Sequence, residues 1–84
     1  MELKTNKKQS PKEILEKIKG TLQSLGFSLI QEHDTTAGNI YEFENNDKTT
    51  KIFCRISPSD STNVVFLEFS LPIIEKKLKE ALKT

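Results

Sequence analysis

The segment that most constrains the fold is Lys51–Ser70, which reads KIFCRISPSDSTNVVFLEFS. Two runs rich in β-branched and aromatic residues, Lys51–Ser57 and Thr62–Ser70, flank the turn-forming residues Pro58–Ser61. Runs of this kind suit a pleated, half-buried surface, and the polar segment between them suits a chain reversal. The segment therefore predicts a β-hairpin, and the rest of the chain must either pair with it or cover one of its faces.

An amphipathic helix is predicted on each side of the strand region. Residues 10–13 (SPKE) are typical of a helix start, because Ser10 can cap the helix, proline suits its first position and the glutamate completes a capping box. Apolar residues at helical spacing then predict a helix over residues 11–25 and a second helix from Pro72 to the C-terminus. Gly20 interrupts the first helix and suggests close packing against the sheet. The apolar positions are Ile14, Leu15, Ile18, Leu22 and Leu25 in the first helix, and Ile74, Leu78, Ala81 and Leu82 in the second.

Two further strands are predicted between the first helix and the hairpin. They are Phe27–His33 and Asn39–Asn45, with a polar turn at Asp34–Gly38 and a tight reversal at Asn45–Lys48. The order α-β-β-β-β-α predicts an α+β, two-layer sandwich, in which both helices cover one face of a four-stranded antiparallel meander. The predicted inward residues are Phe27, Leu29, Tyr41, Phe43, Ile52, Cys54, Ile56, Val65, Leu67 and Phe69.

The charge is distributed unevenly along the 84 residues, although the net charge is only +1. Residues 1–20 and 71–84 are basic, whereas residues 31–70 are acidic, which suggests a polarised surface. Residues 1–9 have no apolar period and are predicted to form a flexible basic arm that precedes a single domain over residues 10–84. A chain of this size buries only about 60% of its unfolded surface, so we expect modest stability unless a partner adds to it.

The positions that alternate with the predicted core residues would form an apolar stripe on the uncovered face of the sheet. With the turns above, Phe53 would lie opposite both Phe66 and Ile40, and Ile30 would lie beside Ile40. One interpretation is that these cross-strand neighbours only stabilise the sheet. The alternative is an interaction surface for a protein partner, a second copy or another domain of a longer parent chain. The candidate interface residues are Ile30, Ile40, Phe53, Val64 and Phe66.

The sequence contains no pattern typical of a catalytic, metal or cofactor site. His33 stands beside Asp34 in a predicted turn, where acid–base chemistry is a weak alternative to a solvated pair. Cys54 falls on the predicted core face and is interpreted as a small buried apolar residue. One histidine and one cysteine cannot form a zinc site. We therefore expect a protein that is not an enzyme and that needs no cofactor, with a small enzyme subunit that uses His33 as the weakest alternative.

Lysines near both ends of the chain are the remaining signal. They could be a solvated surface with Glu13–Lys17 and Glu75–Lys79 ion pairs, or a patch that binds acidic headgroups or an acidic protein surface. Nucleic acid is disfavoured, because the net charge is low and the strands are acidic. A polar N-terminus and a single cysteine predict a cytoplasmic or nuclear location. The candidate anion-binding or lipid-binding residues are Lys7, Lys8, Lys12, Lys76, Lys79 and Lys83.

The order of elements resembles the kinase-associated domain at the C-terminal end of several Ser/Thr protein kinases. The resemblance covers residues 10–84 and depends on SPKEILEKIKGTLQSLGF, on the strands KIFCRI and NVVFLEFS, and on the closing helix IIEKKLKEALK. It implies a regulatory module that binds acidic phospholipid, holds a kinase domain inhibited, or both. The chain departs from the family where Leu71-Pro72 directly follows the last strand, in place of a longer Gly- and Arg/Lys-containing segment.

A second resemblance is to RWD-type domains, which also combine a helix, a meander and a terminal helix. The segments GNIYEFENND and KIFCRI are similar to those domains, which usually continue beyond the point where this chain ends. This resemblance implies a protein-docking or dimerisation adaptor whose lysines only increase solubility. Both resemblances predict a non-catalytic interaction module.

Overall fold

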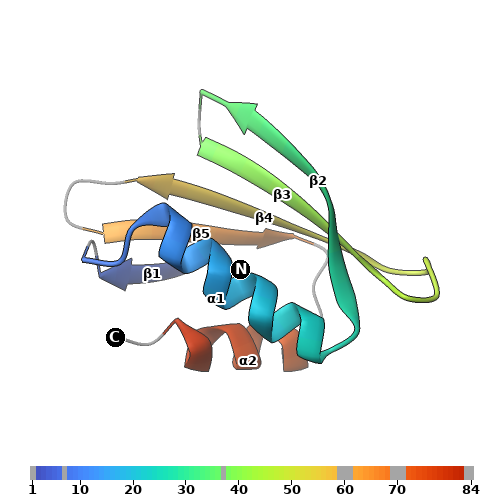
Figure 1. Cartoon of the computed structure of the whole chain (residues 1–84). Helices are drawn as coiled ribbons and strands as arrows, with labels where there is room; N and C mark the ends of the chain where they lie inside the picture. The colour runs from blue at the N-terminus through green and yellow to red at the C-terminus, as the bar shows by residue number, and fades with distance from the viewer. Residues whose placement is uncertain (1, 7, 37, 59–61, 69–71, 83–84) are drawn as a thin grey trace.

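The structure, a computed structural model, describes residues 2–6, 8–36, 38–58, 62–68 and 72–82. The described chain is an α+β fold with one antiparallel sheet and two helices (Figure 1). The strands lie in the order β1-β5-β4-β3-β2 across the sheet. In chain order, the elements are β1 (Glu2–Asn6), α1 (Pro11–Ser24), β2 (Phe27–Thr35), β3 (Gly38–Asn45), β4 (Lys51–Pro58), β5 (Thr62–Glu68) and α2 (Pro72–Ala81).

Both helices lie on the same face of the sheet, as the sequence predicts (Figure 1). The apolar stripes of α1 and α2 meet the inward side chains of the strands in one core, whose largest fully buried side chain is Phe43. All the predicted inward residues in the described chain belong to this core or pack against it, whereas Phe69 lies outside the described residues. Neither α1 nor α2 has the length and apolarity that crossing a bilayer requires, in the part of the chain that the structure describes.

The predicted four-stranded sheet is wrong in one respect, because a fifth strand forms where we expected a flexible arm. β1 pairs antiparallel with β5, and Leu3 lies opposite Val65. Leu3 and Thr5 alternate along this strand, and both are buried on the helix-covered face. Two inward side chains are too few to produce a visible apolar period, but they are enough to add a short strand to the edge of a sheet.

The start of α1 at Pro11 and its cap by Ser10 are as predicted. Pro11 is its first residue, and the Ser10 hydroxyl accepts a hydrogen bond of 3.2 Å from the Glu13 amide. This contact satisfies one of the amides that a helix start leaves without a partner. The interpretation of Gly20 is wrong. Gly20 is exposed, and a Cβ added there would meet nothing within 4 Å, so close packing does not explain the glycine.

The turn between β3 and β4 is longer than expected, and this changes the partner of every residue across the two strands. The Asn45 amide donates to the Thr50 carbonyl, so residues 46–49 form the loop in place of residues 46 and 47 alone. The Asn45 side chain holds this loop by accepting from the Thr49 and Thr50 amides at 2.9 and 3.1 Å. Lys48 adopts a positive φ of 59° within it. Ile40 therefore pairs with Arg55, two residues beyond the expected Phe53.

The other two registers also differ from those expected. The predicted turn Pro58–Ser61 falls largely on residues 59–61, outside the described residues, but Pro58 already pairs with Asn63. Between β2 and β3, a β-bulge leaves Ile30 as an extra residue between Leu29 and Gln31, so Ile30 does not lie beside Ile40. The register shifts between β3 and β4 and between β4 and β5 are each of two residues. Such a shift keeps each side chain on its predicted face but gives it different neighbours.

Candidate interaction surface

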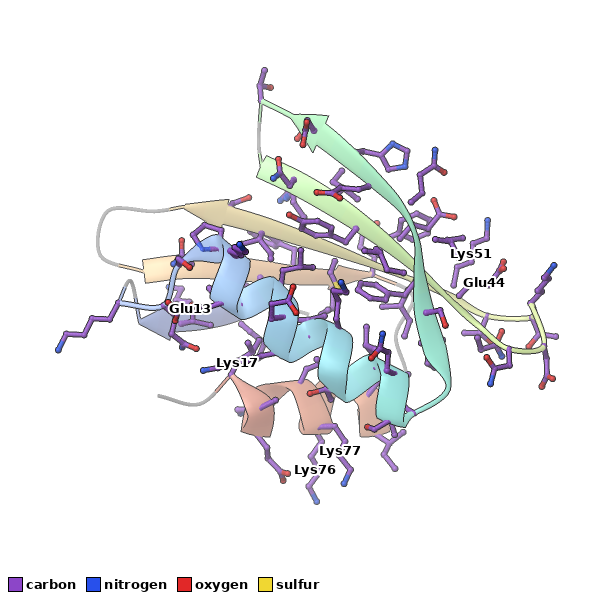
Figure 2. All side chains as sticks on the ribbon, viewed as in Figure 1. Glu13, Lys17, Glu44, Lys51, Lys76 and Lys77 are labelled. Atoms are coloured by element: carbon purple, nitrogen blue, oxygen red, sulfur yellow. The ribbon has the colours of Figure 1, made fainter. Side chains whose placement is uncertain are left out.

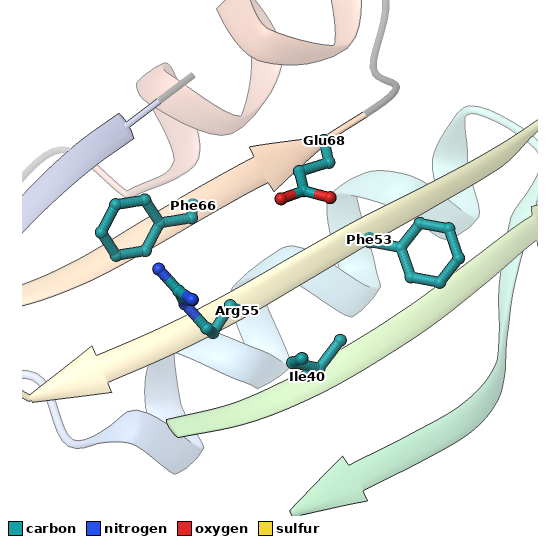
Figure 3. A pocket seen from close by; sticks show the side chains of 5 residues that line it. All are labelled: Ile40, Phe53, Arg55, Phe66 and Glu68. Carbon is teal, nitrogen blue, oxygen red and sulfur yellow. The ribbon is translucent and has the colours of Figure 1, made fainter. Parts of the chain in front are cut away.

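The face of the sheet opposite α1 and α2, called here the open face, carries the candidate surface. Among the described residues, no helix covers it (Figures 1 and 3). Strand alternation places on it the side chains that lie between the core positions. The apolar and aromatic residues of the open face are half-buried, and they are Ile40, Phe53, Val64 and Phe66.

A shallow pocket of about 110 Å³ lies near the middle of the open face. We call it the Arg55 pocket, because the Arg55 side chain crosses it between β4 and β5 (Figure 3). β3 contributes Ile40, β4 contributes Phe53 and Arg55, and β5 contributes Phe66 and Glu68. The pocket therefore combines two aromatic rings and an aliphatic side chain with one charge of each sign.

The Arg55 guanidinium stacks on the ring of Phe66, with its Cζ atom 4.2 Å from the ring centroid. Such a cation–π contact is worth about 0.5–2 kcal/mol, depending on how far water is excluded. The Nε atom of Arg55 is buried and has no hydrogen-bond acceptor in the described chain. A buried donor without an acceptor costs about 1–3 kcal/mol, and the cost is larger when the group is charged. The arginine is thus held in place by the ring, and no carboxylate among the described residues forms an ion pair with it.

The predicted apolar row is correct about the face and wrong about the neighbours. Arg55, not Phe53, lies opposite both Ile40 and Phe66. Phe53 lies opposite Glu42 on one side and Glu68 on the other. Ile30, 47% exposed, is the extra residue of the bulge. The surface is consequently a mixed apolar and charged pocket, and the continuous apolar stripe that the sequence predicts is interrupted by Arg55.

A second cluster of charged residues on the open face is centred on Glu42. This carboxylate is almost fully buried and pairs with the Lys51 ammonium at 3.1 Å (Oε2 to Nζ). The hydrogen bond from Lys51 to Glu42, together with the attraction between the two charges, raises the pKa of the lysine above its ordinary value. His33 Nε2 lies 3.8 Å from the other oxygen of Glu42. The partner of His33 is therefore Glu42, whereas Asp34 points to the opposite face by strand alternation.

The structure gives Cys54 a structural role. It is fully buried in the core, and this burial raises the pKa of its thiol to about 12. A neutral thiol without access to solvent is a poor nucleophile. Among the residues that the structure describes, no group of three or more metal-ligating side chains lies together.

The candidate lysines belong to two regions that the fold brings together. α1 and α2 run antiparallel, and the Gln9 side chain donates to the Leu82 carbonyl at 3.4 Å, so the start of α1 lies beside the end of α2. Lys76 and Lys79 line a groove with the acidic residues Glu2 and Glu75, and Lys76 projects from α2 away from the sheet (Figure 2). Lys8 and Lys12 are exposed at the start of α1, while Lys7 and Lys83 lie outside the described residues.

The expected ion pair between Glu13 and Lys17 is replaced by another contact. The Lys17 ammonium donates to the Gln9 side-chain oxygen, at the position where the chain enters α1 (Figure 2). A different pair on the same helix, Glu16 and Lys19, is 4.0 Å apart, with Glu16 exposed and Lys19 half-buried. Exposed pairs of this kind add little to stability.

Comparisons with known protein families, curated proteins and solved structures find no match to this chain. The resemblances to kinase-associated and RWD-type domains therefore stay predictions.

Arg55 and Glu68 are the two pocket residues that the sequence reasoning missed. The available signal was strand alternation in KIFCRIS, which places Arg55 on the same face as Phe53. An apolar period does not indicate Arg55 or Glu68, because it marks only the apolar residues of a strand face. Arginine beside aromatic residues is itself the composition that protein interfaces favour.

Proposed function

We propose that this chain is a non-catalytic interaction module, and that its open face binds a protein partner. The observation that carries the proposal is the Arg55 pocket on the open face, in which an arginine stacks on an aromatic ring and has no anionic partner among the residues that the structure describes. Aromatic residues and arginine supply a large share of the binding energy in protein interfaces. This is the protein-docking function that the sequence left open as an alternative.

Site-specific photo-crosslinking tests this proposal. The full chain would carry p-benzoylphenylalanine in place of Phe53, on the open face, or in place of Lys77, which is exposed on α2. We expect crosslinks from position 53 in native cells and none of comparable yield from position 77. The absence of any protein crosslinked through position 53 would contradict the proposal.

A second candidate function is attachment to an acidic membrane or protein surface through the lysines at the α1 start and α2. The observation that favours it is the Gln9–Leu82 hydrogen bond, which places the Lys8 and Lys12 region beside the end of α2. Each basic residue near an acidic bilayer contributes about 1 kcal/mol. In a longer parent protein, such attachment would couple location to regulation of a neighbouring kinase domain, as the first resemblance implies.

Pelleting with phosphatidylserine vesicles separates the two functions. If the lysines bind acidic headgroups, the double variant Lys76→Glu/Lys79→Glu should lose binding that the wild-type chain shows at low salt and loses at high salt. The control for surface location is the single charge reversal Lys48→Glu in the β3–β4 turn, and each single variant, Lys76→Glu and Lys79→Glu, is compared with it so that the change in net charge is equal. Equal binding by the α2 variants and the control, or no binding by the wild-type chain at low salt, would exclude this function.

A further inference from the structure

We propose that the partner on the open face is a second copy of this chain, in a two-fold symmetric dimer that places Arg55 of each copy against Glu68 of the other. This inference rests on the proposed function and specifies its partner. It follows from the arrangement of four side chains on β4 and β5, and from the charge of the whole open face.

The four side chains form a block of two by two positions. Arg55 lies directly opposite Phe66, and Phe53 lies directly opposite Glu68. The two phenylalanines therefore occupy one diagonal of the block, and the two opposite charges occupy the other (Figure 3). Although both charges line the same pocket, no ion pair joins them within the described residues.

This block is complementary to itself. In a symmetric dimer of facing sheets, the two-fold axis lies between the sheets and parallel to them. A residue on the axis then faces the same residue of the other copy, and a residue beside the axis faces the residue that lies at the mirror-image position on the other side of the axis. An axis along the diagonal of Phe53 and Phe66 places each ring against the same ring of the other copy. The same axis places each Arg55 against a Glu68, and it does so twice. One operation thus supplies the missing anion and covers the aromatic rings.

The crossing angle that results is compatible with known sheet packing. With residues on one face about 6.7 Å apart along a strand and strands about 4.8 Å apart, the diagonal lies roughly 35° from the strands. Strands of the two copies would then cross at roughly 70°, which is closer to the orthogonal class of sheet packing than to the aligned class. The helices would remain on the outside of such a dimer.

The charge of the open face favours a second copy over a strongly charged partner. The basic residues Lys4, Lys51 and Arg55 are nearly balanced by the acidic residues Glu2, Glu42, Glu44 and Glu68. A strongly acidic partner would meet the glutamates, and a strongly basic one would meet the arginine and lysines. A second copy related by two-fold symmetry matches such a surface, because it places a glutamate of one copy against an arginine of the other.

The available area sets the expected strength. Five strands with about seven residues each give a face of roughly 24 by 23 Å in projection, and a standard interface buries about 800 Å² of accessible surface per partner. The side chains make the accessible area larger than the projection, so a dimer would need nearly the whole face. We therefore expect an affinity in the micromolar range rather than an obligate dimer.

Pairing of edge strands is the competing route to a dimer. The outer edge belongs to β2 on one side and to β1 on the other. β2 is interrupted by the bulge at Ile30 and presents the exposed charges Glu32 and Asp34, features that oppose edge-to-edge pairing. β1 is short, with only five residues.

Sedimentation equilibrium of the purified full chain from about 1 μM to about 1 mM tests the dimer. We expect self-association that weakens at least about tenfold in R55E and in E68R, because each variant places like charges against each other. An equimolar mixture of R55E and E68R should regain most of the wild-type affinity, since every pair is then of opposite charge. The double variant R55E/E68R should do the same on its own. The control K77E, a charge reversal on α2, should associate as the wild type does.

A monomer at every concentration would overturn the inference, as would variants that weaken association but do not recover on mixing. A dimer insensitive to both variants would place the contact elsewhere, at an edge strand or on α2, and would also overturn it. Circular dichroism verifies that each variant folds. If R55E does not fold, E68R still decides, because Glu68 is exposed and Glu68→Gln should weaken association less than the charge reversal. A monomer that nevertheless crosslinks another protein through position 53 would remove the dimer and leave the proposed function intact.

Discussion

At the scale of single residues, Cys54 connects burial to stability at high pH. Burial raises the pKa of its thiol from 9.0 to about 12. Above pH 9 the unfolded chain therefore releases a proton that the folded chain retains, and the stability contributed by the neutral thiol is lost as the pH rises toward 12. We expect this residue to lower the free energy of unfolding by about 1.4 kcal/mol per pH unit within that window. Urea titrations at several alkaline pH values measure the slope.

The Cys54→Ala variant separates this effect from the titration of Lys51, whose raised pKa acts in the same direction above the ordinary lysine value of 10.5. Because Lys51 and the other lysines are unchanged in the variant, the difference between the two slopes belongs to the thiol. Equal slopes for both proteins would contradict the prediction. Alkylation by iodoacetamide provides an independent check, since the folded chain should react far more slowly than the chain in guanidinium.

Two glycines should respond to alanine in opposite directions. Gly20 lies on the exposed side of α1 with open space around its Cα, so Gly20→Ala should stabilise the fold by up to about 1 kcal/mol. Gly38 has φ of +124°, and an added Cβ would clash with the Ile56 carbonyl oxygen. Gly38→Ala should therefore cost at least about 2 kcal/mol. Thermal and urea unfolding of the pair measure both changes, and a stabilised Gly38→Ala would contradict this account of the β2–β3 turn.

At the scale of elements, a buried polar cluster connects β1, the α1 start, β5 and α2. The Asn63 side chain donates to the Gln9 carbonyl at 2.7 Å, and the Thr5 hydroxyl donates to the Asn63 carbonyl at 3.3 Å. The Gln9 side chain continues the connection to Leu82. Asn63 is only 2% exposed. Buried polar groups that are fully satisfied in this way specify one arrangement of the elements around them.

Replacing Asn63 by alanine should lower the free energy of unfolding by about 1–3 kcal/mol, because the Gln9 carbonyl then loses its donor in a buried place. Asn46→Ala, in an exposed turn, is the matched control and should change stability by less than about 0.5 kcal/mol. Amide exchange adds a readout of position: the α1 start and the end of α2 should exchange faster in Asn63→Ala only. Similar behaviour of both variants would show that the cluster does not hold these elements together.

Most elements could be predicted from the sequence because each carries its own periodic signal. The Ser10 start of α1 and the inward residues of β2 to β5 are of this kind. β1 could not, because Leu3 and Thr5 give only one step of alternation, and their burial depends on Val65 and Asn63 far along the chain. Local pattern does not contain such long-range pairing.

The candidate surface was predictable in its location but not in its chemistry. Alternation determines the face on which Phe53 and Phe66 lie. Lengthening a turn by two residues changes their neighbours but not that face. Which residue lies beside Ile40 depends instead on the length of the turn after Asn45, and the extra residues of that turn depend on hydrogen bonds from the Thr49 and Thr50 amides to the Asn45 side chain. The sequence therefore predicts an apolar face, while the pairing of Arg55 with Phe66 follows only from the three-dimensional register.

At the scale of the whole molecule, β1 closes one side of the sheet and completes both of its faces. On the covered side, Leu3 packs into the core with Val65, and on the open face Glu2 and Lys4 lie beside Phe66 and Val64. A chain without β1 would leave the backbone of β5 as an unpaired edge next to apolar side chains. Exposed edges of this kind promote association through added strands.

Removal of residues 1–6 distinguishes a structural strand from a dispensable arm. We expect the shortened chain to lose several kcal/mol of unfolding free energy, because it gives up the burial of Leu3 together with the β1–β5 hydrogen bonds. It should also associate non-specifically through the β5 edge, in a way that R55E does not suppress, whereas the dimer of the full chain should depend on that residue. The full-length variant Leu3→Asp, which keeps the backbone of β1 but cannot bury its side chain, should lose comparable stability. A truncated chain as stable as the full chain would contradict the structural role of β1, because a strand that packs Leu3 into the core cannot be removed without cost.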